Sequence, residues 1–341
     1  MKQFGVLSDG KVVHEYVITN TNGMELHAIN YGGIINKLFV PDVNHNMVNV
    51  VLGHHSLEKY IVDTLFIGAV IGPYANRISN AQFSLNNQIY ELEKNHGSHH
   101  LHSGSFGFYK SYWDIQPIAS PLGEALLLSL SRKDGENGYP GNVCVKVQYT
   151  LTDDNEVIVD YYAETDASTP INLTQHSYFN LSGSVGGNIK NHVLSSPAPY
   201  FLPIRADGVP TGKIVSVSQE KMDLRLPREI DEILADISRQ KKLAQGLDHC
   251  YVLKKTESSE MCDAAHVYSP ESGISLRVQT TQPALQCYTG NFLEGDFCQY
   301  QAMCLETQGY TNAVNEPFFP FEFTRPGIPY TEQTRFMFSA I

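Results

Sequence analysis

The sequence lacks the marks of a membrane or exported protein. No apolar run is long enough to span a bilayer, and the first residues contain no signal-peptide core. The six cysteines include no C-x-x-C pair, so we expect reduced thiols. These absences predict a cytoplasmic protein.

A block of basic residues is also missing. The chain has 24 Lys and Arg against 36 Asp and Glu, for a net charge of −12. An acidic chain of this kind is a poor partner for nucleic acid or for an anionic membrane. The same charge balance disfavours a heavily phosphorylated substrate.

Helical patterns are scarce, whereas strand patterns recur. Residues 143–151 and 157–163 alternate apolar with polar side chains around a polar turn, which predicts a hairpin. A second hairpin is expected at residues 83–92, around Asn86-Asn87, and a further half-buried strand at residues 126–130. The best helix candidate is residues 227–244, which begin with Pro227, continue with acidic residues and end with basic ones.

No repeat, linker or break in composition divides the chain. We therefore predict one domain, residues 1–341. Its fold class is all-β: a large antiparallel β-sandwich with few short helices.

The most informative segment is residues 172–183, Asn-Leu-Thr-Gln-His-Ser-Tyr-Phe-Asn-Leu-Ser-Gly. It places His176 among aromatic, amide and hydroxyl side chains, a setting in which a histidine is tuned for proton transfer. Aromatic faces beside Asn, Gln and His also bind sugars. The segment points to proton transfer on a carbohydrate, although a satisfied core histidine is the simpler alternative.

Further titratable residues stand among apolar or small neighbours. Glu306, between Leu305 and Thr307, is a candidate base because partial burial raises a carboxyl pKa. His176 and His102 are candidate acids or hydrogen-bond donors, and Asp248 and Arg77 could bind hydroxyls. Each also has a structural alternative, such as an exposed strand end for Glu306 or a surface ion pair for Arg77.

An ordered set of segments resembles the aldose 1-epimerases, also called galactose mutarotases. The resemblance covers nearly the whole chain. Its motifs are, in order, Asn-Tyr-Gly-Gly at 30–33, Val-Pro-Asp at 40–42, Ala-Asn-Arg-Ile at 75–78, Leu-His-Ser-Gly at 101–104, Asp-Gly-Glu at 134–136, Gly-Tyr-Pro-Gly at 138–141, residues 172–181, Asp-His at 248–249 and Leu-Glu-Thr-Gln at 305–308.

The resemblance implies interconversion of the α and β anomers of free hexoses such as galactose and glucose. Position by position, it makes Glu306 the catalytic base and His176 the acid, and it makes His102 a ligand of the sugar. Arg77, with its neighbour Asn76, and Asp248 fall among the other substrate contacts. No cofactor is implied, and we expect a monomer or a homodimer.

The sequence departs from the family pattern at Gln175, at Ser103 and in the histidine-rich stretch at residues 95–100. We expect these departures to affect sugar preference. The histidines also raise a metal hypothesis, with His96, His99, His100 and His102 as ligands. No acid follows at short spacing, so we expect loop histidines exposed to solvent and no metal.

Two other functions remain open on the sequence. One is a hexose 6-phosphate epimerase of the same fold, which would need a cationic phosphate pocket. The other is a sugar-binding or regulatory protein without activity. Such a protein would not require the pair of Glu306 and His176.

Overall fold

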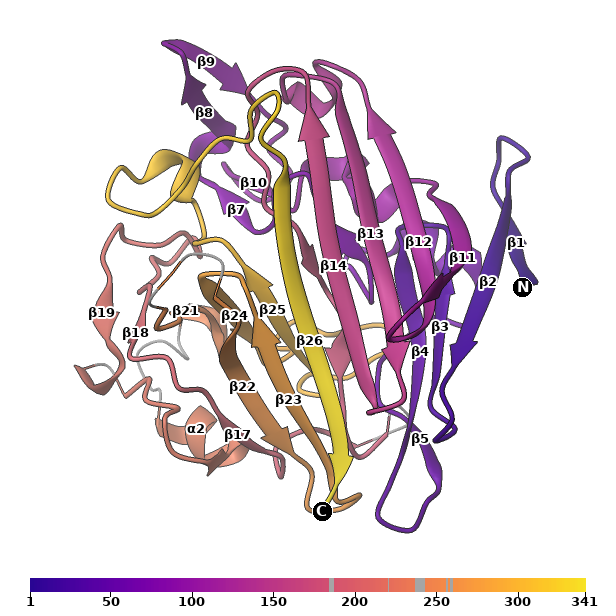
Figure 1. The fold of residues 1–341 in the computed structure, drawn as a ribbon. Coiled ribbons are helices and arrows are strands. Elements are labelled where there is room, and N and C mark those ends of the chain that lie inside the picture. Colours follow the sequence, from indigo (N-terminus) through magenta and orange to yellow (C-terminus); the bar gives the residue numbers. More distant parts are fainter. Residues whose placement is uncertain (184–186, 220, 237–242, 256, 258–259) are drawn as a thin grey trace.

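The protein is built mostly of strands, with two short helices in the part that the computed structural model describes (Figure 1). That part comprises residues 1–183, 187–219, 221–236, 243–255, 257 and 260–341. The helices are α1 (Leu57–Val62) and α2 (Ile230–Asp236).

The largest sheet has nine strands and contains both strands of the hairpin predicted at residues 143–163. Its order is β11-β12-β13-β14-β26-β23-β22-β17-β20. The bounds are β11 Asp114–Ser120, β12 Gly123–Arg132, β13 Val143–Thr152, β14 Glu156–Thr165, β26 Tyr330–Ala340, β23 Ile274–Thr280, β22 Cys262–Tyr268, β17 Val193–Ser195 and β20 Arg228–Glu229.

A six-stranded sheet lies behind the nine-stranded one in Figure 1. Its order is β16-β25-β24-β21-β18-β19. The bounds are β16 Tyr178–Phe179, β25 Met303–Gln308, β24 Ala284–Tyr288, β21 Asp248–Val252, β18 Tyr200–Phe201 and β19 Val215–Ser216.

Residues 2–49 form a five-stranded meander, and three short strand pairs complete the strands of the described residues. The meander consists of β1 Lys2–Val6, β2 Val12–Thr19, β3 Glu25–Ile29, β4 Ile34–Pro41 and β5 Met47–Asn49. The pairs are β6 Val70–Ile71 with β15 Thr174–Gln175, β7 Arg77–Ile78 with β10 His100–Leu101, and β8 Gln82–Leu85 with β9 Gln88–Glu91.

One hydrophobic core joins the three larger sheets. It contains Leu26 of β3, Val159 of β14, Leu305 of β25 and Phe336 of β26. Side chains alternate between the faces of a strand, so each sheet contributes its inner face to this core. The predicted all-β sandwich is confirmed.

The predicted hairpins are confirmed. Residues 143–163 form β13 and β14, which pair in continuous antiparallel register. Residues 83–92 form β8 and β9, with Asn86 and Asn87 at positive φ in the turn. The strand predicted at residues 126–130 is the middle of β12.

The predicted helix at residues 227–244 is wrong at its start. Arg228 and Glu229 form β20 and pair with Leu194 and Val193, so the helix begins at Ile230. The partner strand offers these residues backbone hydrogen bonds, which override their local helical preference. The predicted span continues into residues 237–242, which lie outside the described residues.

All six cysteines are free thiols, as predicted. Among the described residues, neither helix approaches the length and apolar character needed to cross a bilayer.

Candidate active site

One face of the six-stranded sheet packs in the core, and part of the other face lines a pocket. Leu305 of β25 belongs to the core, so its neighbour Glu306 points to the opposite face. Glu306 pairs in register with Gln286 of β24, and Gln286 donates a 2.6 Å hydrogen bond to Asp248 in β21. The register of three strands therefore places two carboxylates on one face.

His176 lies in the short link between β15 and β16. β16 pairs with β25 through Tyr178 and Cys304, which brings His176 against Glu306. The His176 Nε2 atom is 3.7 Å from Glu306 Oε1. The other ring nitrogen, Nδ1, is 3.4 Å from Cys304 Sγ, and the backbone N–H donates to the carbonyl of Ala69.

Arg77 and His102 come from the β7–β10 pair. Arg77 pairs with Leu101, so His102 follows directly beside it. The backbone N–H of Asn76 donates to His102 Nδ1 at 3.1 Å. Asn76 and His102 both have left-handed φ values, 66° and 49°, which is unusual outside glycine and typical of functional sites. Arg77 Nη2 lies 3.7 Å from Asp248 Oδ2.

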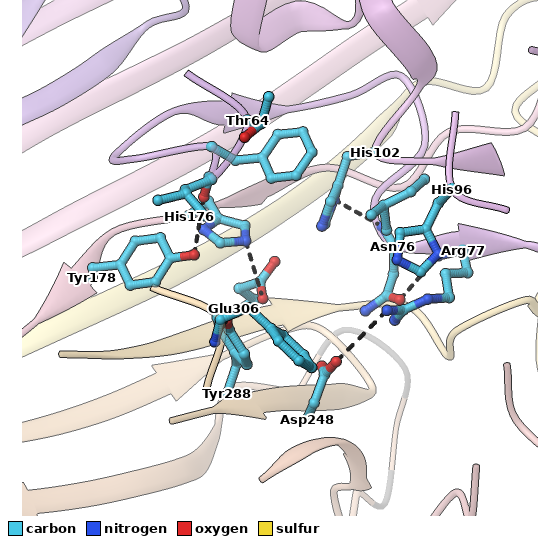
Figure 2. Close-up of a pocket in the computed structure, with 14 residues that line it drawn as sticks. Thr64, Asn76, Arg77, His96, His102, His176, Tyr178, Asp248, Tyr288 and Glu306 are labelled. Atoms are coloured by element: carbon cyan, nitrogen blue, oxygen red, sulfur yellow. Dashed lines mark hydrogen bonds and ion pairs between the residues drawn. The ribbon is translucent and has the colours of Figure 1, made fainter. Parts of the chain in front are cut away.

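These side chains meet in one pocket of about 210 Å³ (Figure 2). All six residues predicted for the site line it: Asn76, Arg77, His102, His176, Asp248 and Glu306. Glu306 is buried within β25, which excludes the alternative of an exposed strand end, and Arg77 is buried as well. Their chemical roles stay predictions.

Much of the pocket wall consists of residues that were not predicted from the sequence. The additional lining residues are Thr64, Leu65, Phe66, His96, Leu101, Tyr178, Tyr288 and Phe292. Tyr178 stands in the segment around His176, where its aromatic character was a usable signal. Leu101 belongs to the Leu-His-Ser-Gly motif and His96 to the histidine-rich stretch, whereas the remaining five come from distant loops and strands without a local motif.

Phe66 forms the side of the pocket next to both histidines. Its ring centroid lies 4.5 Å from that of His102 and 5.7 Å from that of His176. Phe66 has a φ of 61°, so its placement depends on the surrounding structure. The Lys110 ammonium group donates to three carbonyl groups at and just after the end of α1, which fixes the chain ahead of Phe66.

Burial shifts the pKa values of Glu306 and His176 in opposite directions. It raises the pKa of Glu306 well above its ordinary value, and the charge of Asp248 adds to the rise while that of Arg77 opposes it. Burial lowers the pKa of His176 to about 4. It also lowers the pKa of His102 well below its ordinary value, and positive charge on His176 and Arg77 would lower it further.

Two buried polar atoms of the pocket have no hydrogen-bond partner among the described residues. They are Glu306 Oε2 and Arg77 Nε. Buried polar groups nearly always have partners, because leaving them unpaired costs about 1–3 kcal/mol. The two atoms are therefore available to a polar ligand that can both donate and accept hydrogen bonds.

The expectation of exposed loop histidines is wrong for three of the four. His99, His100 and His102 are buried. His99 Nδ1 accepts from the Asn80 N–H, and His100 Nδ1 donates to the carbonyl of Glu93. Within the stretch, the rings of His99 and His100 therefore serve as hydrogen-bond partners of backbone groups in neighbouring segments.

The four histidines do not converge as metal ligands. Among the described residues, the one cluster with metal-like spacing is His102, His176 and Glu306, whose ligand atoms lie within 4.8 Å of one another. However, His102 Nδ1 accepts the Asn76 N–H, so the neutral ring carries its proton on Nε2. If a metal bound Nε2, the proton would have to move to Nδ1, where it would face the N–H group of Asn76. The cluster fits a hydrogen-bonding ligand better than a resident metal.

The two single-residue departures support the backbone and do not line the pocket. Ser103 accepts from the Tyr74 N–H and donates to the Tyr74 carbonyl. Gln175 donates to the Gly68 carbonyl and accepts from the Ser177 N–H, each at 2.6 Å. Their effect on sugar preference stays a prediction, and any such effect would be indirect.

A family model described as aldose 1-epimerase matches residues 14–337. The chain belongs to the aldose 1-epimerase family. It is 38% identical to a galactose mutarotase from Sus scrofa over 344 aligned positions, which cover 98% of this chain and 97% of that protein. It is 34% identical to an aldose 1-epimerase from Escherichia coli strain K12, with 97% of each chain covered.

The fold agrees with this family membership. The crystal structure of a galactose 1-epimerase from Lactobacillus acidophilus superposes with a TM-score of 0.86. It has 28% sequence identity, and the match covers 98% of this chain and 96% of that one. The family resemblance that the motifs predicted is confirmed across residues 14–337.

Proposed function

We propose that this aldose 1-epimerase interconverts the α and β anomers of free galactose and glucose, with Glu306 as base and His176 as acid. The observation that carries the proposal is the separation of 3.7 Å between Nε2 of His176 and Oε1 of Glu306 in a buried pocket. The two oxygens that exchange protons, O1 and the ring oxygen O5, are bonded to the same carbon. An acid and a base that serve both must therefore lie this close together.

Between their pKa values the pair of Glu306 and His176 holds one proton, and the pKa shifts favour its position on Glu306. The reactive form is the one in which this proton lies on His176 and Glu306 is ionised. Glu306 removes the proton from the C1 hydroxyl while His176 protonates O5, and the C1–O5 bond breaks. Rotation about C1–C2 exposes the other face of the aldehyde. Ring closure then returns the proton from Glu306 to O1 and that from O5 to His176, so nothing is consumed and no cofactor takes part.

The remaining residues hold the sugar in place. His102 presents Nε2–H, a donor for a sugar hydroxyl oxygen, because Asn76 fixes its tautomer. Arg77 donates and Asp248 accepts, which suits hydroxyl groups that do both. Tyr178, Tyr288 and Phe292 supply apolar faces for the C–H side of a pyranose.

The dependence of kcat/KM on pH should report the pKa values of His176 and Glu306. We expect a bell-shaped kcat/KM: below the His176 pKa of about 4 both groups are protonated and no base remains, and above the raised pKa of Glu306 no acid remains. The Asp248 carboxylate raises both pKa values, so Asp248→Asn should move both limbs to lower pH. Polarimetry across pH, corrected for spontaneous mutarotation, measures this; limbs that stay in place or move upward would contradict the assignment.

Chelators should leave the activity unchanged. Ring opening needs no Lewis acid when a carboxylate and an imidazole are both in place, and the tautomer of His102 disfavours a metal. The measurement is kcat before and after dialysis against EDTA. An activity that EDTA removes and zinc restores would revive the hypothesis of histidine ligands.

Free hexoses should be better substrates than hexose 6-phosphates. Among the described residues that line the pocket, Arg77 is the one Lys or Arg, and it already faces Asp248. We expect kcat/KM for galactose or glucose to be at least about tenfold higher than for the 6-phosphate, in low and moderate salt, because like charges placed together cost binding energy. A 6-phosphate that is turned over tenfold more efficiently than the free sugar would favour the rival function.

A sugar-binding protein without activity is the second alternative, and the buried pair disfavours it. Binding alone does not require a carboxyl group and an imidazole 3.7 Å apart in one buried pocket. We further propose one domain across residues 1–341, since a single core joins all three larger sheets. The cytoplasmic location, the monomeric or dimeric state and the lack of a nucleic-acid partner stay predictions.

A further inference from the structure

His96 is the histidine of the 95–100 stretch that reaches the sugar pocket. It lines the pocket at the rim, where the residue is also exposed to solvent. In Figure 2, His96 lies beside Arg77 and Asn76, on the opposite side of Glu306 from His176. The proposed reaction does not use it.

The loop that carries His96 is anchored on several sides. His96 and His99 exchange two backbone hydrogen bonds, of 3.0 and 3.1 Å. The Asn95 side chain donates to the carbonyl of Leu101 and accepts from its N–H. His99 in turn accepts from the Asn80 N–H. These bonds hold the backbone that carries the imidazole, which lowers the cost of positioning the ring against a substrate.

The position of His96 selects one part of the sugar. In the proposed function, which this inference assumes, Glu306 and His176 hold O1 and O5. In a pyranose ring, C4 lies opposite C1 and C3 lies opposite O5, so the far end of the pocket meets the C3 and C4 hydroxyl groups. His96 lies at that end, next to the Arg77–Asp248 pair.

We propose that His96 is a specificity residue whose imidazole hydrogen-bonds the C4 hydroxyl group and so distinguishes galactose from glucose. The two sugars differ only at C4, where the hydroxyl is axial in galactose and equatorial in glucose. A ring carried by an anchored loop at the rim reaches one of the two orientations better than the other. Partial burial against the pocket wall and the charge of Arg77 lower the pKa of His96, which keeps the ring neutral, with one donor and one acceptor nitrogen.

The test compares three substrates: galactose, glucose and the 4-deoxy hexose. Removal of the C4 hydroxyl makes the first two identical, so the 4-deoxy sugar is a common reference. We expect His96→Ala to lower kcat/KM for the better epimer by roughly three- to tenfold, the effect of one neutral hydrogen bond. The galactose-to-glucose ratio should change, while the 4-deoxy hexose should be unaffected.

The matched control is His45→Ala, at an exposed histidine in the turn between β4 and β5. It should leave all three values unchanged. An equal effect of His96→Ala on all three sugars, or no effect on any of them, would overturn the proposal.

Binding separates this inference from the proposed function. Dissociation constants of the three sugars are measured by calorimetry in Glu306→Gln and in Glu306→Gln/His96→Ala, where no turnover is needed. The role of His96 is supported if the galactose-to-glucose ratio of dissociation constants changes while the dissociation constant of the 4-deoxy sugar does not. If wild type binds these sugars without accelerating mutarotation, the proposed function fails while the binding ratio still decides on His96.

Discussion

Glu306→Gln is expected to lower kcat for mutarotation by about 10²–10⁴-fold, the usual contribution of one general base. The amide keeps the shape of the side chain and can still accept a hydrogen bond, but it cannot take the proton from the C1 hydroxyl. Sugar binding should therefore survive. Initial rates by polarimetry and dissociation constants by calorimetry separate the two effects.

Glu332→Gln is the matched control for this variant. Burial raises the pKa of Glu332 to about 7, as it raises that of Glu306, but Glu332 lies in β26 and does not line the pocket. This variant should keep kcat close to wild type. If Glu306→Gln retained more than a few per cent of wild-type kcat, Glu306 would not be the base.

His176→Asn is expected to lower kcat by about 10²-fold or more, because the variant has no group that can protonate O5. His102→Asn should weaken binding as well, since His102 is expected to donate to a sugar hydroxyl. A full Michaelis–Menten analysis of both variants tests this division of roles. An unchanged kcat in His176→Asn would assign the acid to another residue.

The control for the histidine variant is His192→Asn. Burial lowers the pKa of His192 to about 4, the same value as for His176, but His192 lies outside the pocket and accepts from the Leu181 N–H. Loss of that hydrogen bond should reduce stability. The kcat per folded molecule should stay close to wild type, which distinguishes loss of the acid from loss of fold.

Local sequence patterns were sufficient for the hairpins because those strands are half-buried. Over residues 143–148 of β13, buried side chains alternate with more exposed ones, so that one face packs in the core. The same reasoning cannot detect β24 and β25, in which every residue is buried. There the alternation separates the core from the pocket, and the polar residues Gln286 and Glu306 mark the pocket face.

The site residues could be predicted because each is an unusual residue type in its local context. The rest of the wall could not be predicted in this way. Phe66 reaches the pocket because its backbone is left-handed and because Lys110 fixes the chain just before it, at the end of α1. This long-range arrangement leaves no local pattern in the sequence. His96 could be noticed as part of a histidine-rich stretch, but only the fold separates it from His99 and His100, which support the backbone.

The most direct test of the account is polarimetry on freshly dissolved α-galactose and α-glucose, with wild-type protein and with Glu306→Gln. We expect wild type to accelerate the approach to the spontaneous final rotation without changing that value, because only the anomeric equilibrium is catalysed. Glu306→Gln should follow the uncatalysed curve closely. No acceleration by wild type, or a different final rotation, would contradict the claim that this protein is a mutarotase acting through Glu306.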